Sequence, residues 1–392
     1  MINVTIQIPN KKSSIMYDAV VAGGSISGLL AAREIAKEGY SVLVLEEGFE
    51  VGSPEHCGGL VSKNALKELE LEPSQKTFDS EIECAKIFSP EGKEITINSK
   101  RQQIIVINRR ELDKQAARQA KDNGAKICVK TSFQEKIKDG VRTSNGEIKC
   151  KYFVDCRGVL RLANKDRDGI LLTAQYEVYA DWIKEGQVEV YFDQKRYPEF
   201  FAWIIPSDEG KGKVGIAGKG VNVSDTLNEF LKQKGEFSTI RKIFAPIWIK
   251  GPIKRFVEGN TVIVGDAAGQ AKPTTAGGIF TSGMGGVYAG QAIAAFLKTN
   301  ERKELDNYQK KWTERFGKEF EKQLLARKIL ERMDNQTINK LFETITPDII
   351  NEISEKDDFD FHTSSIIKLL GIKGSLKTAQ TLVSGELKKI LG

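Results

Sequence analysis

The sequence predicts an α/β protein in three parts: a domain built on parallel strands, an antiparallel sheet and a helical C-terminal region. Three observations lead to this class. Strand and helix patterns alternate early in the chain, aromatic residues with alternating polarity gather in its middle, and charge-dense helical spacing fills its end. We assign residues 1–165 together with 251–300 to the first domain, 166–250 to the sheet and 301–392 to the helical region. Residues 80–100 are candidates for joining the sheet.

The composition is that of an ordinary soluble protein of 392 residues, of which 40% are hydrophobic and 29% charged. The net charge of +6 is a mild excess among 59 basic and 53 acidic side chains, so we expect no nucleic-acid partner. The cysteines form no C-x-x-C pair, and His56 and His362 are the only histidines, so we expect no metal site. The sequence has no apolar run long enough to span a membrane and no signal-peptide pattern, which favours a cytoplasmic location.

Residues 17–47 predict a strand, a glycine turn, a helix and a second strand. Positions 17–22 and 41–45 are apolar and rich in β-branched residues, as buried parallel strands are. Positions 29–38 carry apolar residues at helical spacing, and Gly39 ends that helix. This order and scale are those of a Rossmann-like mononucleotide-binding unit.

The turn reads G-G-S-I-S-G and has the residue types that a pyrophosphate needs. Gly23 permits a sharp turn, the small side chain of Ser25 lets the backbone approach the anion, and Gly28 lets the helix pack on the strand. Glu46 lies eighteen positions after Gly28, where a carboxylate can accept hydrogen bonds from ribose hydroxyls. We predict a dinucleotide site, with a merely structural turn as the alternative. Its candidate residues are Gly23, Gly24, Ser25, Ser27, Gly28, Glu46 and Glu47.

A polar, glycine-bearing loop is predicted over residues 48–59, and Ser62 is a natural N-cap for the helix that follows. The loop ends in Cys57, Gly58 and Gly59, a pattern that indicates backbone lying tightly against a flat group. A plain loop with a buried structural thiol is the alternative.

Another candidate contact stands at the head of a predicted helix that Asn108 caps and that ends near residues 123–124. Arg109 is placed there to reach a phosphate. A solvated arginine is the alternative.

Aromatic residues concentrate between positions 165 and 250, and residues 187–192 alternate in polarity as a strand does. Residues 197–218 predict two strands joined by a turn that Pro206 leads. An antiparallel sheet with one aromatic face suits a large apolar ligand, and an ordinary core face is the alternative.

A second glycine-rich segment occupies residues 260–290. A strand over 261–264 closes on Gly265 and Asp266, whose carboxylate can accept a hydrogen bond from a sugar-alcohol hydroxyl. The following loop leads into a helix of small residues, where backbone N–H groups can face a ring that becomes anionic on reduction. The candidate residues of this loop are Pro273, Gly277, Gly278 and Ile279.

The end of the chain, residues 361–392, has five lysines against one acidic residue, interleaved with isoleucine and leucine. This pattern suits an amphipathic element on an anionic membrane surface, and a solvated pair of surface helices is the alternative.

Residues 17–300 together resemble the large flavoprotein group of FAD-dependent reductases and aromatic hydroxylases. The run TVIVGDAA at 261–268 is similar to the motif whose aspartate, here Asp266, binds the ribityl chain of FAD. Arg109, with Leu112 and Asp113 after it, resembles the R-x-x-F/L-D element whose arginine lies near the cofactor. The resemblance therefore implies FAD as the cofactor.

Within that group the chain most resembles the geranylgeranyl reductase family, which includes digeranylgeranylglycerophospholipid reductase-like flavoproteins. The loop EHCGGLVSKNALKEL and the run GDAAGQAKPTTAGGI are similar to the family's cysteine–glycine and cofactor-closing segments. Residues 198–206 resemble the substrate motif P-x-x-Y-x-W-x-F-P, with Phe201 where tyrosine is usual and Ile205 where phenylalanine is. Arg157 replaces the aspartate of the hydroxylases' Asp–Gly pair, which argues against direct NAD(P)H use in their manner.

The resemblance implies an FAD-dependent reductase that saturates C=C bonds of isoprenoid chains in membrane lipid biosynthesis. Cys57 is then the candidate for supplying the proton or for gating, and the candidate substrate residues are Tyr191, Phe201, Trp203 and Pro206. The alternatives are a flavin-dependent monooxygenase on an apolar or aromatic substrate, and an electron-transfer flavoprotein that docks with a ferredoxin. A ferredoxin or another carrier is also the expected electron donor of the reductase, with peripheral membrane contact expected through residues 361–392.

Overall fold

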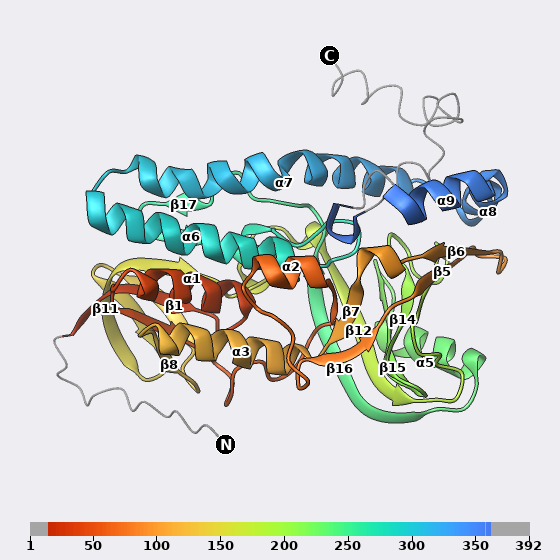
Figure 1. Ribbon diagram of the computed structural model, residues 1–392, viewed down its shortest axis with the longest axis horizontal. Coiled ribbons are helices and arrows are strands. Elements are labelled where there is room, and N and C mark those ends of the chain that lie inside the picture. The colour runs from red at the N-terminus through yellow and green to blue at the C-terminus, as the bar shows by residue number, and fades with distance from the viewer. Residues whose placement is uncertain (1–14, 357, 362–392) are drawn as a thin grey trace, which may run out of the picture.

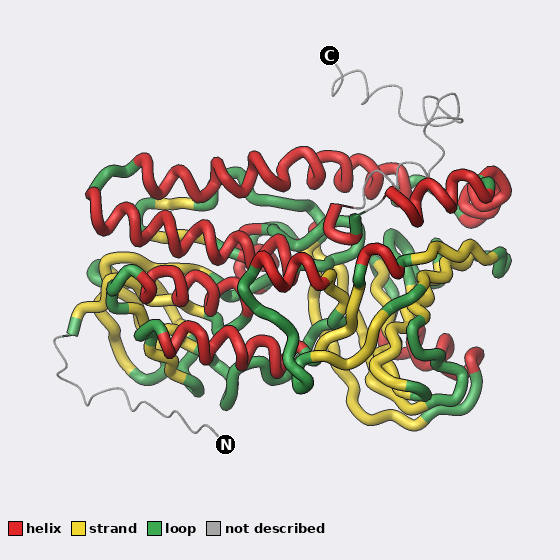
Figure 2. The backbone as a smooth tube through the Cα atoms, viewed as in Figure 1, coloured by secondary structure: helices red, strands yellow, loops and turns green. Residues whose placement is uncertain are grey.

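The computed structural model describes residues 15–356 and 358–361. An α/β lobe and a lobe built mainly of antiparallel strands stand side by side (Figure 1). Two long antiparallel helices lie along the α/β lobe, and the outer one continues towards the second lobe. Figure 2 shows the separation of strands into these two lobes, with the helical C-terminal region along one side. The predicted α/β class is confirmed.

The α/β lobe is built on an eight-stranded sheet in which β1 pairs in parallel with both β2 and β11. Residues Ala19–Ala22 of β1 are at most 1% exposed, because both faces of the strand are covered. Ala19 and Val21 lie in a core cluster with helix residues such as Leu29, whereas Val20 and Ala22 lie in a second cluster with strand residues such as Val141. The strands of this sheet are β17 (Val257–Glu258), β18 (Thr261–Ile263), β11 (Gly146–Asp155), β1 (Met16–Ala22), β2 (Val42–Leu45), β8 (Lys126–Cys128), β10 (Gly140–Thr143) and β9 (Phe133–Ile137).

Helices α1 (Ile26–Lys37), α3 (Arg109–Asp122) and α6 (Ile279–Thr299) pack together on this lobe. Helix α1 begins at Ile26, three residues before the predicted start, because Ser25 is the extended N-cap residue. The predicted caps are confirmed: the Asn108 side chain accepts from the Glu111 N–H, and the Ser62 side chain accepts from Ala65 at the start of α2 (Lys63–Glu68).

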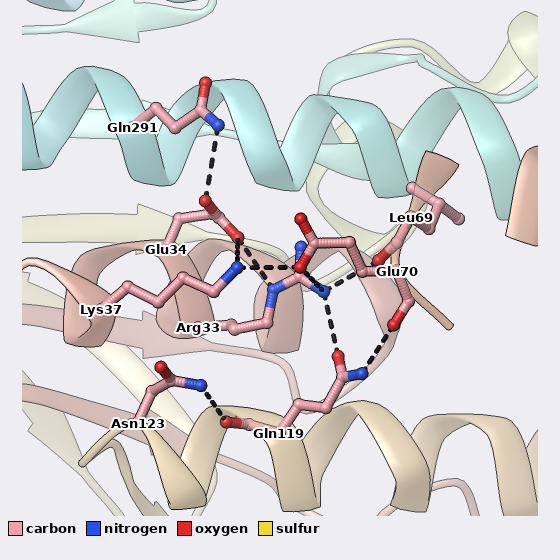
Figure 3. Close-up of polar contacts among 8 residues, drawn as sticks. All are labelled: Arg33, Glu34, Lys37, Leu69, Glu70, Gln119, Asn123 and Gln291. Carbon is pink, nitrogen blue, oxygen red and sulfur yellow. Dashed lines mark hydrogen bonds and ion pairs between the residues drawn. The ribbon is translucent and has the colours of Figure 1, made fainter. Parts of the chain in front are cut away.

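A buried arginine joins α1 to its neighbours (Figure 3). The Arg33 guanidinium contacts the Glu34 carboxylate at 2.8 Å and donates to the Leu69 carbonyl and the Gln119 side chain. Its side chain is 2% exposed. The network extends to α6, where Gln291 donates to Glu34. Because buried charges are costly unless paired, this network holds α1 in one position.

The second lobe is a seven-stranded sheet in the order β16-β12-β15-β14-β13-β5-β6. Its pairs are antiparallel apart from β13 with β5. Residues 84–98 belong to this sheet although more than 70 residues separate them from its next strand, which begins at Ile170. Helix α5 (Val223–Lys234) covers one face. The strands are β16 (Ser238–Trp248), β12 (Ile170–Tyr179), β15 (Lys211–Gly218), β14 (Ala202–Asp208), β13 (Gln187–Tyr191), β5 (Cys84–Phe88) and β6 (Glu94–Asn98).

Pro206 does not lead a turn, contrary to prediction. It lies inside β14, opposite Gly212, and the chain reverses at residues 209–210, where Gly210 has a φ of +66°. The register of β14 against β15 shifts just after Pro206. A proline, which has no N–H to donate, is tolerated at such an irregularity.

A small third sheet is formed by β3 (Leu60–Ser62), β7 (Ile104–Ile107) and β4 (Phe78–Glu81), which come between β2 and β8 in the chain order. Helix α7 (Lys303–Leu330) packs antiparallel along α6, and α8 (Asn335–Thr344) and α9 (Pro347–Lys356) lie near β5 and β6 (Figure 1). Short helical turns are α4 (Leu160–Ala163), η1 (Lys100–Gln102), η2 (Arg167–Gly169), η3 (Gly265–Ala268) and η4 (Phe359–Phe361).

No helix within residues 15–356 and 358–361 combines the length and apolar character that a bilayer span requires. The predicted membrane-contact element lies, apart from Phe361, outside the described residues.

Candidate active site

The glycine turn after β1 has no room for side chains. Gly23 has a φ of +112°, and a Cβ there would lie 2.3 Å from the Cys156 carbonyl oxygen. A Cβ on Gly28 would lie 2.1 Å from the Gly23 carbonyl oxygen. The Ser25 side chain makes no capping hydrogen bond to α1. The first turn of α1 is thus held close to the end of β1, which is the arrangement that binds a pyrophosphate.

Glu46 lies at the end of β2 and faces this turn. Its carboxylate accepts from the Gly24 N–H at 2.9 Å and from the Gly48 N–H at 2.7 Å. Burial raises the pKa of this carboxyl, and the two backbone hydrogen bonds oppose that rise. The side chain is fixed by backbone donors where the sequence predicts a ribose contact. Its neighbour Glu47 is exposed.

The second glycine segment meets the first. A Cβ on Gly265 would lie 2.5 Å from the Ser27 Oγ, and β18 lies beside β11 in the same sheet. Asp266 follows in η3 and accepts a hydrogen bond from Ser282 of α6 at 3.2 Å. Burial raises the pKa of Asp266. The structure therefore brings both predicted cofactor motifs to one edge of the sheet, at the carboxyl ends of its strands, where ligands bind in such folds.

Arg109 is buried at the head of α3. Its Nη2 lies 3.1 Å from Asp113 Oδ1, and its charge also acts on Asp266. Burial alone would lower the pKa of Arg109, but the Asp113 carboxylate and the Cys57 thiol beside it raise the pKa above its usual value. In the part of the chain that the structure describes, the Arg109 Nε has no hydrogen-bond partner. A buried donor without a partner favours a ligand at this place.

The cofactor-closing loop leads into α6 as predicted. A Cβ on Gly278 would lie 3.2 Å from Asp266 Oδ1, and Ile279 is buried at the start of the helix. The Pro273 carbonyl accepts a hydrogen bond from the buried Arg327 of α7 at 3.3 Å. Gly277 accepts a backbone hydrogen bond from Lys272. Helix α7 therefore supports this loop from behind.

The segment Cys57, Gly58 and Gly59 is wedged between the two lobes. A Cβ on Gly58 would lie 2.7 Å from Ile205 Cδ1 of β14, and one on Gly59 would lie 2.5 Å from the Ile107 carbonyl of β7. The Gly59 N–H lies 3.3 Å from the Cys57 Sγ, and Cys57 is half-buried. Gly59 is thus required by the close approach of the β7 backbone and by its φ of +88°, whereas at Gly58 the near atom is the tip of a flexible side chain. The flat group predicted to lie against these glycines stays a prediction.

The structure separates the four predicted substrate residues. Phe201 and Trp203 lie together, with their ring centroids 6.1 Å apart. Both pack against the buried cluster of Leu171, Phe200, Ala217 and Ile249, which Ala276 of the cofactor-closing loop also contacts. Tyr191 lies instead on the α5 face, where its ring contacts Phe230 at 5.1 Å. Tyr191 pairs with Ala202 of β14 and therefore shares its face. Trp203 is the next residue along β14, and successive side chains of a strand point to opposite faces.

Pro206 falls on the same face as Ile204, which packs against α5, and so points away from Trp203. Tyr191 and Pro206 therefore do not share a face with Trp203. Ile205 does, and it packs with Trp203 on the face towards the small sheet of β3 and β7.

Sequence reasoning missed three polar residues beneath the Cys57 segment. Lys213 of β15 lies 2.6 Å from Glu55, and both side chains are at most 7% exposed. Arg241 of β16 lies 3.3 Å from the other oxygen of Glu55. Gln175 of β12 is buried and contacts both Cys57 and Trp203. These residues could have been suspected from the sequence, because Gln175 and Lys213 lie inside apolar strands, where a polar side chain requires a partner.

Ion pairing controls the charge state of Glu55. Burial alone would raise the pKa of this carboxyl, but Lys213 and Arg241 hold it below its ordinary value. Glu55 therefore stays a carboxylate that anchors the loop to the sheet.

Arg157, which replaces the hydroxylases' aspartate, is held at the end of β11. It forms a bidentate pair with Asp155 at 2.9 Å and lies 4.2 Å above the Phe133 ring. The described part of the chain holds no group of three or more His, Cys, Asp or Glu side chains arranged for a metal ion.

Comparison with known proteins places these features in a family. The chain is 30% identical over 358 residues to a digeranylgeranylglycerophospholipid reductase of Methanocaldococcus jannaschii, with 84% of this chain and 90% of the relative covered. The chain belongs to the digeranylgeranylglycerophospholipid reductase family. Another member, digeranylgeranylglycerophospholipid reductase 2 of Methanothermobacter thermautotrophicus, is 29% identical over 364 residues, covering 86% of this chain and 94% of the relative.

The fold agrees with this membership. A crystal structure of a geranylgeranyl bacteriochlorophyll reductase-like protein from Thermoplasma acidophilum superposes with a TM-score of 0.83 and 24% identity, covering 94% of this chain and 99% of the other. No family model matches the sequence. In this reductase-family chain, Glu46 contacts the Gly23–Gly28 turn and Gly265 approaches Ser27 of the same turn. The charge of Arg109 acts on Asp266, which follows Gly265. These residues fit a dinucleotide cofactor.

Proposed function

We propose that this protein is an FAD-dependent reductase that saturates C=C bonds of geranylgeranyl chains in the biosynthesis of membrane lipids. The observation that carries the proposal is the position of the Cys57 segment. It joins a dinucleotide cradle in one lobe to an aromatic wall in the other, in a chain of the digeranylgeranylglycerophospholipid reductase family.

In this proposal several of the predicted residues hold a part of the cofactor. The N-terminus of α1 would hold the pyrophosphate, Glu46 the adenosine ribose and Asp266 the ribityl chain. Arg109 has a free Nε–H for an oxygen or nitrogen of the cofactor. The Gly277–Gly278 backbone and Ile279 would border the ring at the start of α6. FAD, once reduced, supplies a hydride for the alkene.

The chain itself has three tasks in such a reaction. Phe201, Trp203 and Ile205 form an apolar wall that can hold an isoprenoid chain and exclude water. The glycines at 58 and 59 let the loop lie flat between the lobes. Cys57 is the candidate proton donor, because its thiol is half-buried beside the Arg109 guanidinium.

We also propose that the reducing equivalents come from a separate carrier, such as a ferredoxin. The sequence has no iron–sulfur cysteine spacing of its own. Peripheral membrane contact through residues 361–392 is part of the same proposal, because the substrate would be a membrane lipid.

The test is an anaerobic incubation of the purified yellow protein. The protein is reduced with dithionite and supplied with a geranylgeranyl phospholipid or geranylgeranyl diphosphate, and products are read by mass spectrometry. We expect mass gains of whole hydrogen pairs. Oxygen addition that requires air and NAD(P)H would instead support a monooxygenase. A protein that is colourless and takes up no added FAD would contradict the proposal.

The role of Cys57 is tested in the same assay with Cys57→Ser. We expect turnover to fall at least about tenfold while the flavin spectrum is kept, because a hydroxyl is a far weaker proton donor than a thiol. Cys84→Ser is the matched control, since Cys84 is also a half-buried free thiol but lies in β5. Full turnover in Cys57→Ser would exclude the proton-donor role.

A further inference from the structure

The Trp203 indole lies across the surface of the sheet toward β12. Trp203 pairs with Gly215 of β15, and Gly215 pairs with Gln175 of β12. A Cβ on Gly215 would lie only 2.4 Å from the Trp203 Cζ2. The missing side chain at position 215 therefore lets the indole pass over β15. The Trp203 Nε1–H then donates to Gln175 Oε1 at 3.1 Å.

The other end of the same amide holds the Cys57 segment. Gln175 Nε2 donates to the Cys57 carbonyl oxygen at 3.2 Å, across 118 positions of sequence. Gln175 is 6% exposed, so bulk water cannot easily replace either hydrogen bond if it is lost. The side chain thus connects the aromatic wall to the residue proposed as proton donor.

The chemistry of this link requires an amide. An indole N–H can only donate and a backbone carbonyl can only accept, so the residue between them must accept at one end and donate at the other. Glutamine does both. A methionine of the same length does neither, and an ionised glutamate cannot donate.

The chain just before Cys57 is also bound to the sheet, through Glu55. Glu55 pairs with Lys213 and Arg241, which lie on the same face of the sheet as Gln175. These ion pairs hold the loop to the sheet, whereas the Gln175 bond reaches the backbone of Cys57 itself. A shift of Trp203 when an isoprenoid chain occupies the wall would therefore be passed to Cys57.

We propose that Gln175 is a positioning residue that couples the Trp203 side of the substrate wall to the orientation of Cys57. This inference rests on the proposed function, because it assigns the wall to the substrate and the thiol to the reaction. It adds a residue that no sequence motif identifies. It also makes the position of the Cys57 thiol depend on a contact made by Trp203.

The test reads the Cys57 thiol directly and needs no turnover. The oxidised holoenzyme is treated with iodoacetamide, and alkylation of Cys57 is followed by peptide mass spectrometry. In Gln175→Met we expect the rate of Cys57 alkylation to change by about fivefold or more, because the loop loses its anchor at that residue. The flavin absorption spectrum serves as the check that the variant retains cofactor.

The matched control is Thr173→Val. Thr173 lies two positions earlier on the same face of β12 and donates to the Ala245 carbonyl at 2.9 Å, so its loss also removes one buried hydrogen bond. It makes no contact with the Cys57 segment in the hydrogen bonds described. We expect alkylation at the wild-type rate. An equal change in both variants would show that Gln175 acts only through general stability and would overturn the proposal.

A second variant removes the same link from the other side. Trp203→Phe keeps an aromatic ring but has no N–H, so Gln175 loses its fixed orientation. If the two residues act in series, the double variant changes the alkylation rate no more than the larger single effect. Effects that multiply, or a wild-type rate in Gln175→Met, would contradict the coupling. If Gln175→Met does not fold, the alkylation rate of Cys57 in Trp203→Phe tests the coupling instead.

Turnover gives an independent readout. In the anaerobic lipid assay, Gln175→Met is expected to lower kcat about tenfold and leave KM within about twofold, because the wall remains while the thiol is displaced. If wild-type protein reduces no isoprenoid, the proposed function fails, yet the alkylation experiment still decides whether Gln175 positions Cys57.

Discussion

Ile205 packs so closely on Gly58 that a Cβ added to the glycine would lie 2.7 Å from the isoleucine Cδ1. This contact joins the Cys57 segment to the seven-stranded sheet at the point where the two lobes meet. The atom that would be displaced is the tip of a flexible side chain, so the conflict can be relieved by shortening that side chain.

We therefore expect Gly58→Ala to lower the free energy of unfolding by about 1–3 kcal/mol, as overpacking does in well-filled interiors. Adding Ile205→Val removes Cδ1 and should restore most of that loss. Urea denaturation of the two single variants and the double variant measures this. Strictly additive losses would show that Ile205 is not the group that excludes a side chain at position 58.

The glycine turn provides a prediction about cofactor binding. Gly28→Ala would place a Cβ 2.1 Å from the Gly23 carbonyl oxygen, a backbone atom that cannot move without opening the turn. We expect FAD affinity to fall at least about a hundredfold, measured by flavin fluorescence on titration of the apoprotein.

The control for this variant is Gly39→Ala. Gly39 ends α1 with a φ of +80°, and a Cβ there would meet nothing within 4 Å. It should lower stability slightly through backbone strain while leaving FAD affinity unchanged. Equal loss of affinity in both variants would show that the effect comes from α1 as a whole.

The buried Arg33 provides a prediction about stability. Arg33→Met removes the partner of Glu34, which is 8% exposed, and should cost about 3 kcal/mol of unfolding free energy because a buried carboxylate loses its main counter-charge. Chemical denaturation gives the value. Arg142→Met, which removes an ion pair from the exposed surface, is the control and should leave the midpoint unchanged. If Arg33→Met lowers the free energy of unfolding no more than the control does, Lys37 alone is sufficient to compensate the charge of Glu34.

Asp79 provides a prediction about pH. Burial raises its pKa to about 6, with Glu55 and Glu177 adding to the rise and Lys213 and Lys211 opposing it. The folded state therefore binds this proton more tightly than the unfolded state, so Asp79 lowers stability as the pH rises from about 4 to about 6.

Asp79→Asn should remove that part of the pH dependence. Above pH 6 we expect the variant to be more stable than the wild type by about 1–2 kcal/mol, a range that allows for solvent screening at a partly exposed carboxyl. Thermal unfolding at pH 4, 5, 6 and 7 compares the two proteins. Parallel curves over this range would contradict the raised pKa.

Local features could be read from the sequence because they depend on residues close together in the chain. The glycine turn from Gly23 to Gly28, the caps at Ser62 and Asn108, and the loop before α6 all lie as predicted, since turn sterics and capping act within a few positions. The fold class and the family resemblance follow from such features, whereas the meeting of the two cofactor motifs depends on the pairing of β18 with β11.

Only the tertiary structure decided which residues from the two lobes come together at the candidate site. Tyr191 and Trp203 both belong to aromatic strands, but only the pairing of β13 with β14 shows that they face opposite sides of the sheet. Gln175 and Cys57 are 118 positions apart, and Glu55 and Lys213 are 158 apart. Strand register and lobe packing decide such contacts, because a shift of one residue exchanges the two faces of a strand.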